Sequence, residues 1–145
     1  MNNDRPDPGP GPSEHPAALR MSVPASLAAI DLAVEEVRRR LQASAPEADL
    51  FPALTALREA LLNAVVHGCR QDPALAVDLE LNVDGNEAII LVTDPGPGFD
   101  WRERPPTMPP AGSTSGRGRC IMNLYALAVR YNEAGNGLTL RLALA

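Results

Sequence analysis

The sequence predicts an α+β fold built as one domain, and three features of its hydrophobic pattern indicate this class. Between residues 26 and 68, apolar residues recur at intervals of three and four, which is typical of amphipathic helices. After residue 76 the period changes to two, and Asp84-Gly85 is a strong signal for a hairpin turn. After residue 116 a further helical pattern is followed by a second hairpin. We therefore expect two helices, a hairpin, a loop, a helix and a hairpin.

The composition limits the kinds of protein that this chain can be. Its 145 residues are 45% hydrophobic but only 3% aromatic, so one domain with an aliphatic core is expected. A net charge of −5 without a long basic run argues against nucleic acid as the main ligand. Cys69 and Cys120 have no thiol or His at ligand spacing, which argues against a zinc knuckle or disulfide framework and suits a reducing compartment. No apolar run approaches the ~20 residues of a membrane span, so we expect a soluble, cytoplasmic protein.

The first 17 residues are predicted to be a disordered, proline-rich tail. Residues 1–16 hold five prolines and two glycines, and they cannot bury enough apolar area to offset the entropy cost of ordering them. We therefore place the folded domain at residues 18–145. It is expected to begin with an edge strand from Leu19 to Val23, ended by Pro24. A helix follows from Ser26 to near Pro46, with its apolar side formed by Leu27, Ile30, Val34, Val37 and Leu41.

A second helix is predicted to begin at Phe51-Pro52 and to end at Gly68 as a left-handed cap. Its core-facing residues are expected to be Leu54, Leu57, Leu61 and Val65. Glu59, Asn63 and His67 form a polar stripe on the other side. A carboxylate and a carboxamide one turn apart can hold a hard cation and orient a water or hydroxyl. Taken alone, a solvent-exposed helix face explains the stripe more often than a ligand does.

The strands and the long loop carry the next candidate residues. A strand from Ala76 to Val83 leads through the turn to a nearly continuous apolar strand from Ala88 to Thr93. That strand is expected to be central and covered on both faces, or to have a buried end. The stretch from Trp101 to Ser115 has no periodicity, and its length favours a functional loop such as a lid. A helix from Arg119 to Ala128 is expected to pack through Ile121, Leu124, Tyr125 and Ala128, before a hairpin of Val129 to Asn132 and Leu138 to Leu144.

Three groups of residues share one explanation, a bound nucleotide. Asp94 follows the apolar strand, and an ionised Asp there can accept a hydrogen bond from an exocyclic amine such as that of adenine. Gly116 and Gly118 stand at a helix start, where free amides and a partial positive charge favour phosphate. Asn63 can complete the shell of a Mg²⁺ ion that otherwise binds phosphate oxygens and water. The nucleotide is expected to lie between the second helix and the long loop.

Three motifs resemble those of one family in order and spacing. E-A-L-L-N-A-V-V-H-G resembles the N box of the GHKL (histidine kinase-like) ATPase superfamily, D-P-G-P-G its first glycine box, and S-G-R-G-R-C-I-M its second. The resemblance covers residues 18–145 and looks closest to the bacterial anti-sigma factor serine kinases. It implies a two-layer α/β sandwich of the Bergerat type, with helices on one face of a mixed, mostly antiparallel sheet.

The resemblance also implies a role for each matching residue. Glu59 would be the general base and Asn63 the Mg²⁺ ligand. Asp94 would recognise adenine, Gly96 and Gly98 would shape the base pocket, and Gly116 and Gly118 would wrap the phosphates of ATP. Thr139, in G-L-T-L near the end of the chain, would support the adenine contact. The implied partners are an anti-sigma factor antagonist, phosphorylated on serine, and a sigma factor. The implied assembly is a homodimer, with neither nucleic acid nor membrane as a partner.

Two departures and two alternatives accompany this interpretation. Arg119 stands where the family commonly has an apolar residue, and Pro95 and Pro97 should stiffen the first glycine box. The same motifs also fit a nucleotide-gated binding module without kinase activity, or a weak ATPase of another bacterial signalling assembly. The presence of Glu59 favours the kinase, because a clamp needs no base.

Overall fold

The computed structural model describes residues 19–98 and 117–144. The elements are β1 (Leu19–Pro24), α1 (Leu27–Ser44), α2 (Phe51–Asn63), the π-helix η1 (Ala64–Gly68), β2 (Ala76–Asp84), β3 (Glu87–Thr93), α3 (Arg117–Tyr125), β4 (Ala128–Tyr131) and β5 (Gly137–Ala143). The predicted tail, the predicted lid and Gly116 lie outside the described residues. No helix in the described ranges is long and apolar enough to cross a membrane.

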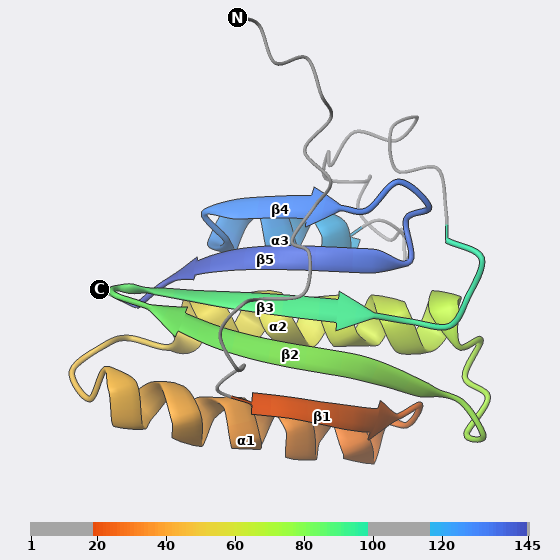
Figure 1. Ribbon diagram of the computed structural model, residues 1–145, viewed down its shortest axis with the longest axis horizontal. Coiled ribbons are helices and arrows are strands. Elements are labelled where there is room, and N and C mark those ends of the chain that lie inside the picture. The colour runs from red at the N-terminus through yellow and green to blue at the C-terminus, as the bar shows by residue number, and fades with distance from the viewer. Residues whose placement is uncertain (1–18, 99–116, 145) are drawn as a thin grey trace, which may run out of the picture.

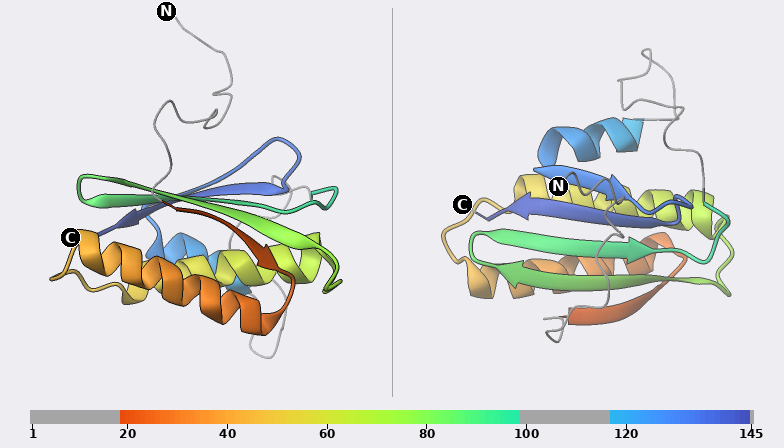
Figure 2. Two further views of the ribbon diagram at one scale, coloured as in Figure 1. Left: turned by 60° about the horizontal axis from the view of Figure 1, so that its bottom comes forward. Right: turned by 45° about the horizontal axis from the view of Figure 1, so that its top comes forward.

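The fold is an α+β sandwich, as the sequence predicted. Within residues 19–98 and 117–144, five strands form one sheet in the order β1-β2-β3-β5-β4. The three α-helices lie against one face of this sheet, while the other face carries no helix in the described part of the chain (Figures 1 and 2). All four strand pairings are antiparallel, so the described sheet is more uniform than the mixed sheet that the resemblance implied.

The β2–β3 hairpin fixes which strand residues face the helices. Asp84 pairs with Glu87 across the turn, where Gly85 has φ +58° as such turns require. Alternate residues of β3 are then buried beneath the helices, namely Ala88, Ile90 and Val92. The residues between them are half-buried and lie on the face without described helices, which is called the open face below. In the residues that the structure describes, β3 is therefore central in the sheet and helices cover one of its faces, so of the two expectations the one of helices on both faces is not met there.

α1 begins and packs largely as predicted. Ser26 Oγ accepts a hydrogen bond from the Ala29 N–H at 3.1 Å, which satisfies one of the free amides at the helix start. The buried side of the helix is formed by Ile30, Ala33, Val37 and Leu41. Leu27, predicted to be buried, is 62% exposed, because the packed stripe passes through the small residue Ala33 and leaves Leu27 on its margin.

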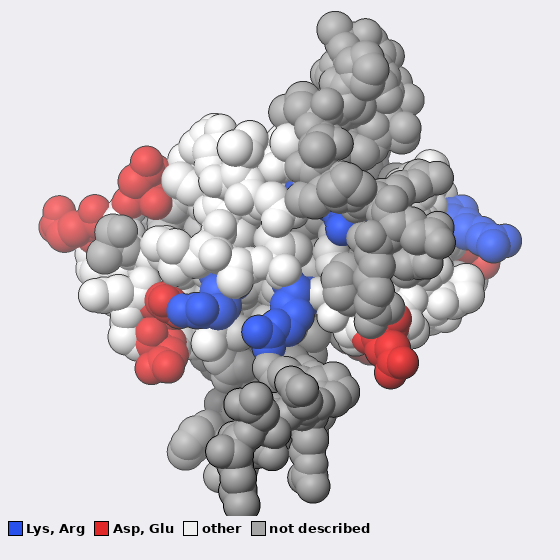
Figure 3. Space-filling view, turned by 90° about the horizontal axis from the view of Figure 1, so that it is seen from above, with Lys and Arg blue, Asp and Glu red and all other residues white. Residues whose placement is uncertain are grey.

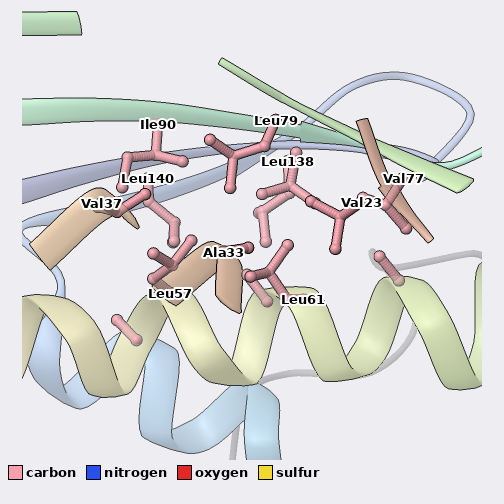
Figure 4. Close-up of a cluster of buried hydrophobic side chains, with 14 of the residues drawn as sticks. Val23, Ala33, Val37, Leu57, Leu61, Val77, Leu79, Ile90, Leu138 and Leu140 are labelled. Carbon is pink, nitrogen blue, oxygen red and sulfur yellow. The ribbon is translucent and has the colours of Figure 1, made fainter. Parts of the chain in front are cut away.

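The core lies between α1, α2 and the sheet and is aliphatic, as the composition indicated. Leu57 and Leu61 of α2 point toward the sheet (Figure 4). They meet a layer of strand residues formed by Val23, Val77, Leu79, Ile90, Leu138 and Leu140. Each fully buried Leu or Ile contributes about 1.5–3 kcal/mol relative to an exposed one, so this layer fixes α2 against the sheet.

α3 departs from its prediction at its end and in its buried side. It ends at Tyr125, and the Leu127 N–H already donates to Arg141 O at 2.8 Å, so the chain has joined the sheet by that residue. Cys120 and Met122 are buried, whereas Leu124 is 67% exposed.

Seen from the side of α3 and β4, charged groups of both signs are scattered over the described surface (Figure 3).

Candidate functional site

The polar stripe of α2 faces α3. Glu59 and Asn63 lie one turn apart and are half-buried. A Cβ atom placed on Gly118 of α3 would lie 2.6 Å from Glu59 Oε2 and 3.4 Å from Asn63 Oδ1. The backbone of α3 therefore approaches both polar groups as closely as it does because residue 118 has no side chain.

The beginning of α3 adds a positive potential to this place. The first amides of a helix have no partner within the helix, and the helix dipole places a partial positive charge there. The structure describes α3 from Arg117 onward, so Gly118 lies in the first turn of the described helix. A carboxylate, a carboxamide and helix amides are therefore brought together from α2 and α3, and this combination suits a phosphate group with a hard cation.

A second group of residues surrounds Asp94 at the end of β3. Asp94 Oδ1 accepts a hydrogen bond from the Gly96 N–H at 2.8 Å, which closes a tight turn of the chain. A Cβ on Gly68 would lie 2.2 Å from Asp94 Cγ, and one on Gly96 would lie 2.5 Å from Gly68 O. The last residue of η1 and the turn after β3 are thus packed directly on each other.

Gly68 serves a different purpose from the one predicted. It was expected to be a left-handed helix cap, but its φ is not positive. The left-handed residues are Arg70 (φ 51°) and Gln71 (φ 58°), where the chain reverses after η1. Gly68 is needed for space, because any side chain would occupy the position of the Asp94 carboxylate.

The π-helix η1 is the feature that the sequence did not predict. The Cys69 N–H donates to Ala64 O at 2.9 Å, a bond five residues back along the chain that widens the last turn. Such turns are rare and occur frequently at functional sites. Here η1 places Gly68 against Asp94, while His67 of the predicted polar stripe is exposed.

The environment of Asp94 changes its acidity. Burial raises the pKa of this carboxyl above its usual value, and the hydrogen bond from Gly96 lowers it by a smaller amount. The carboxylate thus has one acceptor interaction within the turn while its desolvation remains partly uncompensated. An outside donor such as an exocyclic amine would supply part of the missing stabilisation.

Gly98, the second glycine of the first glycine box, meets the β4–β5 turn. It has φ +83°, and a Cβ there would lie 1.7 Å from Ala134 O. Both its conformation and its contact therefore require glycine. The two glycines of this box hold the end of β3 between η1 on one side and the β4–β5 turn on the other.

The structure does not bring Thr139 to these groups. Thr139 pairs with Leu91 of β3, and both lie on the open face of the sheet. Its neighbours Leu138 and Leu140 point toward the helices instead (Figure 4). Because strand residues alternate between faces, the side chain of Thr139 lies on the face of the sheet away from α2 and α3, and its support of adenine stays a prediction. Gly116, also predicted to contact the phosphates, lies outside the described residues.

The predicted Mg²⁺ ion would have few ligands from the protein. Within residues 19–98 and 117–144, no three His, Cys, Asp or Glu side chains gather as a metal site of their own. The described donors near Gly118 are one carboxylate and one carboxamide. This donor set fits Mg²⁺, which prefers oxygen ligands and takes most of them from phosphates and water.

Comparisons with known proteins agree with this geometry. Residues 22–143 match the family described as "Histidine kinase-like ATPase domain". The anti-sigma F factor of Clostridium perfringens (strain SM101) is 31% identical over 130 residues, covering 86% of this chain and 84% of the relative. That of Clostridium beijerinckii is 29% identical over 132 residues, covering 86% and 82%. That of Anoxybacillus flavithermus is 27% identical over 135 residues, covering 90% and 84%.

Proposed function

This chain belongs to the family of histidine kinase-like ATPase domains, and we propose on that basis that it binds Mg²⁺-ATP and phosphorylates a protein serine. The observation that carries the proposal is the contact of Gly118 with Glu59 and Asn63. This contact supports a site at which the phosphates of ATP, a cation and a general base lie together. The turn at Asp94 supplies a separate acceptor for the nucleotide base.

Each residue has a distinct task in this proposal. Asn63 would hold the cation together with the phosphate oxygens, and a bound cation would supply charge neutralisation for the transferred group. Glu59 accepts the proton of the attacking serine hydroxyl. Asp94 accepts a hydrogen bond from the amine of adenine, with Gly96 and Gly98 shaping the turn around it. Gly118, together with Gly116, lets backbone amides approach the phosphates.

The proposed partners follow from the relatives, which are named anti-sigma F factors. We infer that this chain sequesters a sigma factor and that the phosphorylated serine belongs to an anti-sigma factor antagonist. We further propose a cytoplasmic homodimer. Sedimentation at a protein concentration of roughly tens of micromolar should show the dimer, since even weak interfaces associate there. A monomer at that concentration would contradict the proposed homodimer.

Transfer of labelled γ-phosphate from ATP to an antagonist protein tests the kinase proposal. Glu59→Ala should lower transfer by about 10²–10⁴-fold while ATP affinity stays within a few-fold, since binding needs no base. Asn63→Ala should lose both transfer and affinity, because the cation loses its protein ligand. Glu47→Ala, which changes an exposed carboxylate before α2, is the matched control and should change neither.

The measurement separates the kinase from its alternatives. Wild-type transfer rates in Glu59→Ala would show that Glu59 is not the base. ATP binding by the wild type without transfer to any antagonist would favour a nucleotide-gated binding module. Release of free phosphate without a protein acceptor would favour a weak ATPase of another signalling assembly.

A further inference from the structure

Asn136 joins the β4–β5 turn to the turn at Asp94 through two hydrogen bonds, accepting one and donating the other. The Asp94 N–H donates to Asn136 O at 2.9 Å, and Asn136 Nδ2 donates to Gly96 O at 3.2 Å. The two segments are about 40 residues apart in sequence but lie at the same end of the sheet (Figure 1). Asn136 therefore binds both ends of the Asp94–Gly96 turn, while Gly96 N–H binds the Asp94 carboxylate inside it.

The side chain of Asn136 is itself held in one orientation. Its Oδ1 accepts from Asn132 Nδ2 at 2.7 Å, so its Nδ2 is left to face Gly96. Asn132 Oδ1 in turn accepts from the N–H groups of Gly135 at 2.7 Å and of Asn136 at 3.1 Å. In this network the N–H groups of both side-chain amides face oxygen atoms, and both amide oxygens accept from N–H groups.

A glycine provides the space for this network. A Cβ on Gly137 would lie 2.6 Å from Asn132 Nδ2 and would displace the amide that orients Asn136. Gly98, on the other side of the Asp94 turn, contacts Ala134 O in the same β4–β5 turn. Side-chain amides, backbone groups and a close backbone contact thus bind the two turns together at several points.

We propose that Asn136 is a positioning residue that sets the direction of the Asp94 carboxylate and thereby the preference of the site for adenine. The inference rests on the proposed function, because it assumes that Asp94 accepts a hydrogen bond from the adenine amine. Asn136 itself touches no nucleotide in this proposal. It fixes the carbonyl of Gly96 and the amide of Asp94, so the carboxylate between them has one orientation before the base arrives.

Binding of two nucleotides to the full chain tests this inference. ATP carries the amine at position 6 of the purine, and inosine triphosphate carries a carbonyl there. Asn136→Ala should weaken ATP binding by about tenfold, the effect of roughly one hydrogen bond, and leave inosine triphosphate within about twofold. The ATP-to-inosine-triphosphate affinity ratio should therefore fall. Asn123→Ala, on the exposed side of α3, is the matched control and should leave the ratio unchanged.

A second variant removes the donor and keeps the shape of the side chain. Asn136→Asp keeps an acceptor for Asn132 and loses only the donor to Gly96, so the ratio should fall as in Asn136→Ala. Its added charge lies beside the Asp94 turn and, by disfavouring ionised Asp94, lowers the ratio on its own. A fall in Asn136→Asp therefore supports the inference only together with the same fall in Asn136→Leu, which is neutral and of similar size. These two variants decide the question if Asn136→Ala does not fold.

The outcomes separate the inference from the proposed function. An equal loss of both affinities, or an unchanged ratio in Asn136→Asp or Asn136→Leu, would assign Asn136 a purely structural role and overturn the inference. Wild-type protein that binds ATP no better than inosine triphosphate would overturn both the adenine contact and the inference. Wild-type protein that binds neither nucleotide would overturn the proposed function and the inference with it.

Discussion

Gly118→Ala should disable phosphoryl transfer while leaving the protein folded. The new Cβ would lie 2.6 Å from Glu59 Oε2, whereas ordinary contact begins at 3.4 Å, so the carboxylate must retreat by about 0.8 Å. That atom is the far end of a flexible side chain, so the movement is cheap for the fold. Ala also favours a helix over Gly by up to about 1 kcal/mol, and thermal unfolding should show unchanged or higher stability.

The displacement of Glu59 sets the size of the effect on transfer. A misplacement of about 1 Å in a catalytic group can reduce the rate by about 10²-fold, and we expect a loss of this order. Asn63 Oδ1 would lie 3.4 Å from the new Cβ, an ordinary contact, so the cation ligand stays in place and ATP affinity should fall less than transfer. The assay is γ-phosphate transfer beside calorimetry on the same variants, with Asn123→Ala as the control on α3.

A double variant tests whether the effect acts through Glu59. If Gly118→Ala only displaces the carboxylate, then adding it to Glu59→Ala should reduce transfer no further. Additive losses would show that the alanine disturbs the phosphates or the helix start instead. Transfer at the wild-type rate in Gly118→Ala alone would refute the placement of Glu59 as the base.

Three further changes test the Asp94 turn and the core. Asp94→Asn should weaken ATP binding by about 1.5–3 kcal/mol, because a charged acceptor is lost, and unchanged calorimetric affinity would contradict the adenine contact. Because folding raises the pKa of Asp94, the ionisation of Asp94 lowers stability as the pH rises above the unfolded pKa, and this loss is complete above the folded pKa. Asp94→Asn should therefore unfold at a higher temperature than the wild type at neutral pH and show no such gain well below the unfolded pKa. Gly68→Ala should destabilise the protein by about 1–3 kcal/mol, since its Cβ would meet the base of the short Asp94 side chain, and an unchanged denaturant midpoint would contradict that contact. Leu61→Ala, with a fully buried side chain, should cost about 2–5 kcal/mol in the same measurement, and less than 1 kcal/mol would show that the core is not packed as described.

Local periodicity was enough to predict the elements and part of the site. The 100° spacing of α2 residues placed Glu59 and Asn63 on one side and Leu57 and Leu61 in the core, as the structure has them. The turn residues Asp84-Gly85 predicted the first hairpin. These signals depend only on neighbouring residues, so they can be read from the chain without knowledge of its packing.

Features set by distant contacts were not predicted. α3 ends where Leu127 joins Arg141 in the sheet, and no local signal marks that residue as the end of the helix. The π-turn ends at Gly68, which packs against Asp94 of a distant element, and such a contact leaves no local signal in the sequence. The face of Thr139, in contrast, could have been read from the alternation of Leu138, Leu140 and Leu142 along β5, because these leucines assign the odd-numbered positions to the open face.

Two residues of the candidate site, Gly118 and Asp94, share an energetic property that residues of the core do not. Gly118 gives up helix propensity to let α3 approach Glu59, and Asp94 is held in an environment that raises its pKa. Both features work against stability in the free protein, so replacing either residue is expected to keep or raise stability while it removes function. Leu61→Ala has the opposite sign, since it removes packing without touching the polar groups. Variants that gain stability and lose nucleotide binding or transfer would therefore identify the site independently of any structure.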